Sequence, residues 1–251
     1  MLNSKPVSTP VDTGVKLSLA NEEKEVKSTL FKQIVGSLRY LCHTRPDIAY
    51  GVGLISRYMV KPTTSHLVAA KRILRYVKGT RSYGIQYCKG QDGDLVGYSD
   101  SDWSGDKDDR KSTAAYVFMI GNADFSWSSK KESVVALSSC EAEYIAASMA
   151  ACQAQWINML LMELKLIKNE RMELIIDSKS AIDLAKHPVA HGRSKHIETK
   201  FHFLRDQVNN GKLEVEHCRT EEQIADLLTK PLKSSSFEYL KMKLGMVEAS
   251  N

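Results

Sequence analysis

The sequence has little that would suit a secreted, membrane-spanning or zinc-binding protein. Its five cysteines are odd in number and form no CxxC pair, which predicts reduced thiols in a cytosolic or nuclear protein. No apolar run approaches the roughly 20 residues that a membrane span needs, and the N-terminus lacks the charged-then-apolar pattern of a secretory signal. We therefore expect no transmembrane helix and no membrane partner. With 43% hydrophobic and 26% charged residues, the chain is typical of folded globular proteins.

The charge is distributed unevenly. Residues 1–94 hold 15 basic and 7 acidic side chains, whereas residues 95–251 hold 20 basic and 23 acidic ones. A basic first third beside a mildly acidic remainder suggests a polyanion partner and a cation-binding centre. The alternative interpretation of this uneven charge is two solvated surfaces of different charge, without a binding role.

The first ninety residues predict a helical segment. Residues 1–27 are polar, without periodicity, and read as an extended lead-in. Apolar residues at three- and four-residue spacing then predict three short helices within 28–92. The third helix carries Lys71, Arg72 and Arg75, which could contact a phosphate backbone. A solvated basic face is the other interpretation of these residues.

From about residue 93 to residue 232 the pattern becomes α/β. Three apolar strands (95–103, 114–120 and 124–129) predict an antiparallel meander, and a helix is expected over about 139–165. A strand at 172–176, two helices, a strand at 213–217 and a last core helix follow, with a tail helix within 233–251. This order predicts a mixed five-stranded sheet: three antiparallel strands, then parallel βα units, with helices on its faces.

The long helix has a clear start signal. Ser138, with Glu141 three residues later, forms a capping-box pattern. Its alanines would allow close approach to a sheet. We expect its apolar face to consist of Ile145, Met149, Cys152, Trp156 and Leu160.

Four acids fall where strands end or helices begin. Asp100 ends the first strand and Asp177 the fourth, Glu143 lies in the first turn of the long helix, and Asp226 lies early in the final helix. At one end of a sheet such carboxylates would repel one another unless cations bind between them, which favours two Mg²⁺ or Mn²⁺ ions. Singly, Asp226 could serve the helix dipole and Glu143 could be a surface acid. Asp102 faces the same side as Asp100 by strand alternation.

The acidic segments GYSDSDW, ALSSCEAEYIA, LIIDSKSAI and IADLLTKPL resemble the four acidic blocks of the ribonuclease H domain of copia-type LTR retrotransposon Pol polyproteins. The earlier segments KPVSTP, GSLRYL, TRPDIAYGV and RILRYVKGT resemble the stretch that joins reverse transcriptase to that domain. The resemblance implies a ribonuclease H-like fold and a metal-dependent endonuclease that cuts the RNA strand of an RNA/DNA hybrid. Its partner would be the reverse transcriptase portion of the same polyprotein, in a cytoplasmic retrotransposon particle or the nucleus. A YxDD-type polymerase motif is missing, so we expect no polymerase activity.

The resemblance also implies roles for single residues. Asp100, Glu143 and Asp177 match the family's three core metal ligands and Asp226 the fourth, which leaves Asp102 as a group next to the ligands. His217 matches a mobile histidine that handles water or product. Candidates for phosphate contacts are Lys130, Lys131, Arg193, Lys195 and Lys200. A catalytically silent nucleic-acid-binding remnant is the alternative function, and a transposase-like nuclease is a further one.

Overall fold

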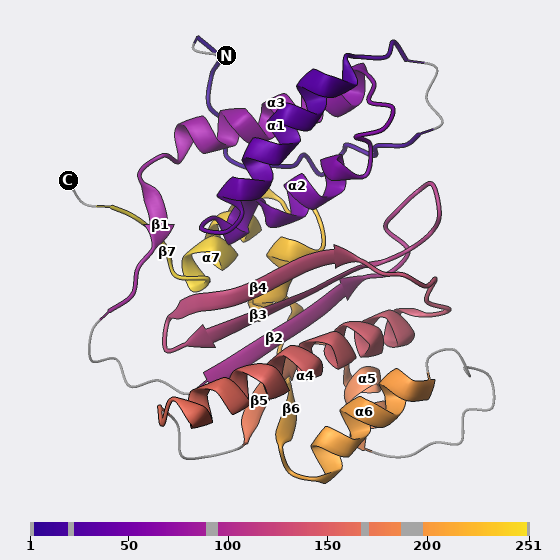
Figure 1. Cartoon of the computed structure of the whole chain (residues 1–251), viewed down its shortest axis with the longest axis vertical. Coiled ribbons are helices and arrows are strands. Elements are labelled where there is room, and N and C mark those ends of the chain that lie inside the picture. Colours follow the sequence, from indigo (N-terminus) through magenta and orange to yellow (C-terminus); the bar gives the residue numbers. More distant parts are fainter. Residues whose placement is uncertain (1–2, 20–22, 89–94, 167–170, 187–197, 250–251) are drawn as a thin grey trace.

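A mixed five-stranded sheet forms the centre of the α/β part of the chain. The computed structural model describes residues 3–19, 23–88, 95–166, 171–186 and 198–249. The strands are β2 (Leu95–Asp102), β3 (Thr113–Ile120), β4 (Ala123–Lys131), β5 (Met172–Ile176) and β6 (Leu213–His217), in the order β4-β3-β2-β5-β6. Strands β4, β3 and β2 pair antiparallel, whereas β2, β5 and β6 pair parallel (Figure 1). This confirms the predicted α/β class and the ribonuclease H-like mixed sheet.

Strand β3 is apolar on both sides because both faces of the sheet are covered. Val117 and Met119 belong to the core on one face, whereas Phe118 belongs to the core on the other. Such double burial suits a continuous apolar run. A tight turn with Gly121 at φ 58° connects β3 to β4, a left-handed conformation that glycine adopts without strain.

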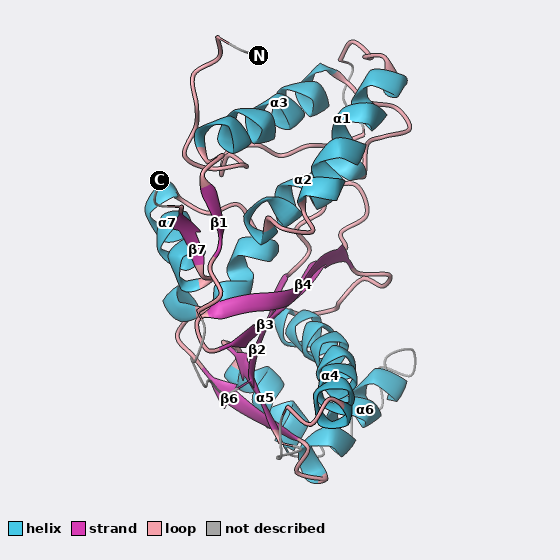
Figure 2. Cartoon of the chain, turned by 60° about the vertical axis from the view of Figure 1, so that its left-hand side comes forward, coloured by secondary structure: helices cyan, strands magenta, loops and turns pink. Residues whose placement is uncertain are grey.

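Three helices cover one face of the sheet: α4 (Ser139–Glu163), α5 (Lys179–Lys186) and α6 (Glu198–Asn209) (Figure 2). The Ser138 side chain accepts a hydrogen bond from the Glu141 backbone N–H, as the capping pattern predicted. The buried side of α4 is built largely of alanine, so the helix backbone lies close to the strands.

The apolar face predicted for α4 was partly wrong. Ile145 is fully buried, but Cys152, Trp156 and Leu160 are exposed. The sheet-facing side consists mainly of alanines, with Tyr144, Ile157 and Leu161 buried among them, and this close packing of the helix against the sheet leaves little space for further bulky side chains. Trp156 and Leu160 therefore lie on the outer side.

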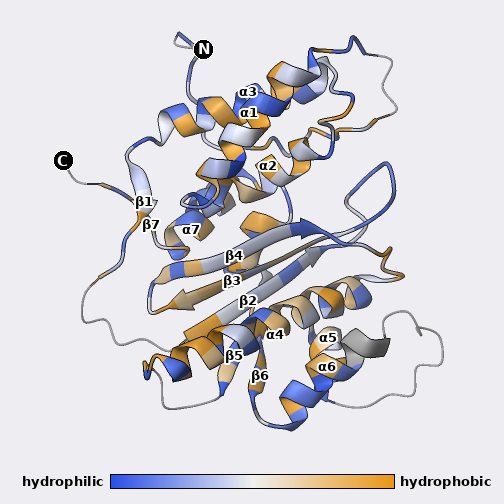
Figure 3. Cartoon of the chain, viewed as in Figure 1, coloured by the Kyte–Doolittle hydropathy of each residue, from blue (hydrophilic) through white to orange (hydrophobic). Residues whose placement is uncertain are grey.

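By length and composition alone, α4 could cross a membrane, and no other described helix meets that criterion. In the folded chain, 56% of its most apolar 18-residue window is buried inside the molecule. Figure 3 shows this apolar helix running along the sheet. A mostly buried core helix of a globular domain passes the same test.

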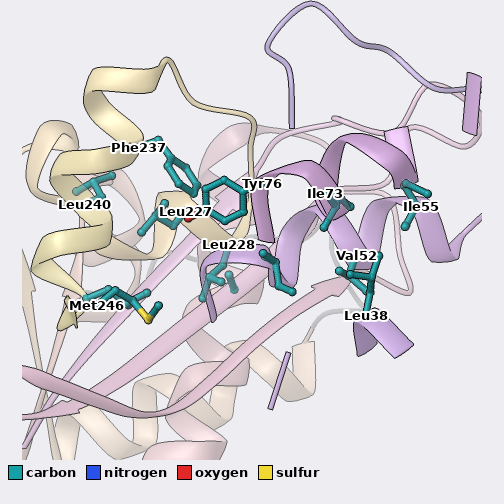
Figure 4. Packing of buried hydrophobic residues seen from close by; sticks show 14 of the residues in the cluster. Leu38, Val52, Ile55, Ile73, Tyr76, Leu227, Leu228, Phe237, Leu240 and Met246 are labelled. Atoms are coloured by element: carbon teal, nitrogen blue, oxygen red, sulfur yellow. The ribbon is translucent and has the colours of Figure 1, made fainter. Parts of the chain in front are cut away.

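The opposite face is covered by segments from both ends of the chain. Three helices pack there: α1 (Ser28–Leu41), α2 (Ala49–Ser56) and α3 (Thr64–Gly79). The short helix η1 (Pro46–Ile48) lies between α1 and α2. From the C-terminal region come η3 (Ile224–Leu228), which follows the short polar helix η2 (Thr220–Glu222), and α7 (Ser234–Lys243). Their apolar side chains form one core, in which Tyr76 of α3 lies against Phe237 of α7 at a ring-centroid distance of 5.6 Å (Figure 4).

A second, two-stranded sheet joins the segment after α3 to the C-terminal segment. Strand β1 (Tyr83–Ile85) pairs antiparallel with β7 (Met246–Glu248). The sequence predicted a tail helix within 233–251, which α7 supplies, but it did not indicate β7. The domain boundary near residue 93 stays a prediction, although α1–α3 share a core with residues of β3, η3 and α7.

Candidate metal centre

Three of the predicted acids meet at one end of the large sheet. Asp100 of β2, Glu143 of α4 and Asp177 after β5 each offer a carboxylate oxygen, and these oxygens lie within 4.8 Å of one another. Asp100 is 1% exposed and Glu143 8% exposed, whereas Asp177 is partly accessible. The three residues are 43 and 34 positions apart in the chain, so only the fold brings them together.

Ordinary local structure positions each of these acids. Parallel pairing of β2 with β5 aligns Tyr98 with Ile175, so Asp100 and Asp177 lie at the same end of neighbouring strands. The Ser138 cap fixes where α4 begins. Glu143 is the fifth residue of α4 and consequently lies at the end of its first turn, close to where the sequence predicted it.

Asp226, the fourth predicted acid, approaches Asp100 from the other side. It lies in the 3-10 helix η3 and not in the α-helix that the sequence predicted. The Gln223 side chain fixes η3 to β2 by donating a hydrogen bond to the Ser99 carbonyl oxygen at 3.0 Å. Asp226 is 4% exposed, and its Oδ1 lies 2.7 Å from the Lys230 ammonium.

The cluster is electrostatically strained without a bound cation. Burial, followed by the charges of Asp100 and Asp177, raises the pKa of Glu143 far above its usual range. Burial and Asp100 likewise raise the pKa of Asp226, and the same two causes raise that of Asp177. Each shift means that the carboxylate form is disfavoured by low dielectric and like charge.

These residues fit a hard divalent cation. Oxygen ligands from three carboxylates suit Mg²⁺ or Mn²⁺. Glu143 Oε2 is buried and has no hydrogen-bond partner within the described ranges, so this carboxylate has unused capacity to bind a cation. A cation placed among the carboxylates would remove the repulsion that raises their pKa values.

Asp102 does not join the group of three acids. Its Oδ1 accepts a hydrogen bond from the backbone N–H of Thr113, its partner in the neighbouring strand. Burial raises the pKa of Asp102 to about 7. The side chain therefore helps to close the end of the β2–β3 ladder.

His217 lies at the end of β6 and is exposed. It pairs in register with Ile176, the residue before Asp177. This places the histidine backbone beside the strand that carries a cluster acid. Its role in water or product handling stays a prediction.

Two of the predicted phosphate-binding residues on α3 already have partners. Arg72 forms an ion pair of 3.0 Å with Asp12, and Arg75 Nε donates to the carbonyl oxygen of Lys5 at 2.6 Å. Lys71 is exposed. The N-terminal segment thus lies along this basic helix, beside a cavity of about 620 Å³ between residues 10–17 and α2–α3.

The other basic candidates differ in their surroundings. Lys130 is exposed, whereas Lys131 is paired with Asp106 at 2.7 Å. Lys200 lies in α6. Arg193 and Lys195 lie outside the described residues. Phosphate contact by this group stays a prediction.

The sequence interpretation missed two residues beside the acids. Thr229 Oγ1 donates a hydrogen bond to Asp100 Oδ2, and the Lys230 ammonium lies 3.9 Å from the same oxygen. Both residues fall in the segment IADLLTKPL, three and four positions after Asp226. On a helical turn, that spacing places side chains beside the acid, so the signal was present in the sequence.

Comparison with known proteins gives long, close matches. The chain is 45% identical over 246 residues to the "Retrovirus-related Pol polyprotein from transposon RE1" of Arabidopsis thaliana, covering 98% of this chain and 17% of that protein. It is 41% identical over 253 residues to the corresponding polyprotein from transposon TNT 1-94 of Nicotiana tabacum, covering 98% of this chain and 19% of that protein. The chain therefore spans less than a fifth of the length of either relative.

Comparison with solved structures finds an N-terminal RNase H domain of rv2228c from Mycobacterium tuberculosis. The TM-score is 0.40 at 12% sequence identity, covering 60% of this chain and 97% of that chain. No protein-family model matches the chain.

Proposed function

The chain belongs to the copia-type retrotransposon Pol polyproteins, and from that premise we propose that it is their ribonuclease H, a divalent-metal-dependent endonuclease. Its substrate is the RNA strand of an RNA/DNA hybrid formed during reverse transcription. The observation that carries the proposal is the convergence of Asp100, Glu143 and Asp177 from three separate elements.

In this proposal, Asp100, Glu143, Asp177 and Asp226 hold two Mg²⁺ or Mn²⁺ ions. Such ions activate water and stabilise the leaving oxygen in phosphodiester cleavage. Asp100 is the central ligand, because it belongs to the group formed with Glu143 and Asp177, and its charge also raises the pKa of Asp226. The Thr229 hydroxyl fixes the orientation of the Asp100 carboxylate by donating to Oδ2.

The remaining residues of the chain bind and orient the hybrid. Lysine and arginine side chains contact the sugar-phosphate backbone, and contacts to 2′-hydroxyl groups select RNA for the cut strand. His217, beside the strand that ends in Asp177, handles water or product. The hybrid and the reverse transcriptase portion of the polyprotein are the proposed partners.

Cleavage of a labelled RNA/DNA hybrid in Mg²⁺ tests this function. We expect the unaltered chain to cut the RNA strand and Asp177→Asn to lose nearly all activity, because one of the three converging carboxylates becomes neutral. Glu163→Gln, which removes an exposed carboxylate of α4, serves as the matched control and should cut normally. Absence of cleavage by folded protein would favour a silent nucleic-acid-binding remnant. Equal cutting of duplex DNA would indicate a general nuclease.

A further inference from the structure

Lys230 lies inside the acidic cluster, and the proposed chemistry gives it no role. Its Nζ is 2.7 Å from Asp226 Oδ1 and 3.9 Å from Asp100 Oδ2. Both of these carboxylate side chains are at most 5% exposed. The ammonium therefore sits between two acids that are assigned here to metal binding.

The backbone around Lys230 is fixed, so the ammonium is directed into the cluster. The Lys230 N–H donates to the Asp226 carbonyl oxygen at 3.3 Å, and Thr229 is bonded to Asp100. Pro231 follows, which restricts the backbone conformation of Lys230. The lysine side chain itself is 35% exposed, and its four-carbon stem is flexible. Its head group can therefore turn toward solvent while the backbone stays in place.

The cluster divides into two cation positions that share Asp100. One is bounded by Asp100, Glu143 and Asp177, whose oxygens converge. The other is bounded by Asp100 and Asp226 and already contains the positive charge of Lys230. An ammonium and a divalent ion cannot occupy the second position together, because they would repel each other and compete for the same oxygens.

We propose that Lys230 fills the second cation position in the substrate-free protein and leaves it for a backbone phosphate of the nucleic acid when a second divalent ion binds. This inference rests on the proposed ribonuclease H function. Lysine is a common point-charge partner of phosphate, and the hybrid brings phosphate to this end of the sheet. Loading of the site is then ordered: one ion binds to the free chain, and the hybrid promotes binding of the second.

A purely structural ion pair predicts a different result. In that case Lys230 would stabilise Asp226 in the fold, and removing it would lower the melting temperature without changing how many ions bind. The two interpretations are separated by ion stoichiometry and affinity, which can be measured without catalysis.

Calorimetric titration of the full 251-residue chain with Mn²⁺, without nucleic acid, tests the proposal. We expect one strong and one weak site in the unaltered chain, and at least about tenfold tighter binding at the second site in Lys230→Met. Lys230→Arg, which keeps the charge, should retain the weak second site. Lys32→Met, which removes an exposed charge on α1, controls for the change in net charge. Melting in EDTA reports whether each variant is folded.

A second titration includes an RNA/DNA hybrid whose RNA carries 2′-O-methyl groups and resists cleavage. The hybrid should tighten the second site of the unaltered chain and have little further effect on Lys230→Met. Two equal sites in the unaltered chain, or an unchanged second site in folded Lys230→Met, overturns the role of Lys230. Hybrid cleavage that persists alongside such a result leaves the ribonuclease H function standing, whereas failure of the unaltered chain to bind Mn²⁺ at all overturns both.

Discussion

Replacing Glu143 by glutamine should stabilise the metal-free chain at alkaline pH. Glu143 is 8% exposed, and burial together with Asp100 and Asp177 raises its pKa from 4.5 to about 10. A raised pKa means that the folded chain keeps a proton which the unfolded chain releases. The stability associated with this proton is fully present below about pH 4.5 and is lost as pH rises toward the folded-state pKa.

The magnitude follows from the pH window. Each pH unit between the two pKa values changes the free energy of unfolding by about 1.4 kcal/mol per group. Between about pH 5 and about pH 8, Glu143 should therefore lower stability by roughly 3 to 4 kcal/mol. Glutamine has no such proton and a similar volume, so Glu143→Gln should lose this part of the pH dependence.

Urea unfolding in EDTA at several pH values across this window measures the effect. Glu163→Gln, which removes an exposed carboxylate on the same helix, should leave the pH dependence of stability unchanged. Added Mg²⁺ should stabilise the unaltered chain at about pH 8 more than Glu143→Gln, which lacks one ligand. Equal pH slopes for the unaltered chain and Glu143→Gln would refute the reasoning, because the buried acid would then be charged in the metal-free fold.

Three further predictions address other parts of the chain. Asp100→Asn should abolish hybrid cleavage, whereas Asp102→Asn should reduce it only partly. The reason is that Asp102 accepts a backbone hydrogen bond and lies outside the group of three acids. The reverse order of cleavage rates would show that Asp100 is wrongly assigned as the metal ligand. Gly97→Ala should lower the free energy of unfolding in urea by about 1–3 kcal/mol, because its Cβ would lie 2.6 Å from the Phe118 ring; an unchanged value would contradict this close packing. Arg45→Met should lower the free energy of unfolding in urea by about 3 kcal/mol, because buried Asp47 would lose its ion pair with Arg45. A loss below about 1 kcal/mol would count against a stabilising role of that ion pair.

Local sequence patterns predicted a large part of the fold. The capping pair at Ser138 and Glu141 identified the start of α4, and the run of apolar residues at 114–120 identified β3. These features depend on neighbours in the chain, because a cap or an apolar run acts over a few residues. They also explain why the α/β class and the order of elements followed from the sequence.

Burial on α4 could not be read from apolar spacing. Trp156 and Leu160 fit an apolar helical stripe as well as the alanines do, yet they are exposed. Which side of a helix faces a sheet depends on how closely the two backbones approach, and small side chains permit the closest approach. That choice is made by packing across the whole domain.

The sequence by itself determined that four acids fall at strand ends and helix starts, and thus predicted a cation centre. The tertiary structure decided how these acids are arranged around it. Strand pairing with Thr113 holds Asp102 by a backbone hydrogen bond, while Asp100 joins the cluster. The position of η3 against β2 brings Lys230 within reach of Asp100, 130 residues earlier in the chain. Such contacts are fixed by the docking of distant segments, and local propensities carry no information about them.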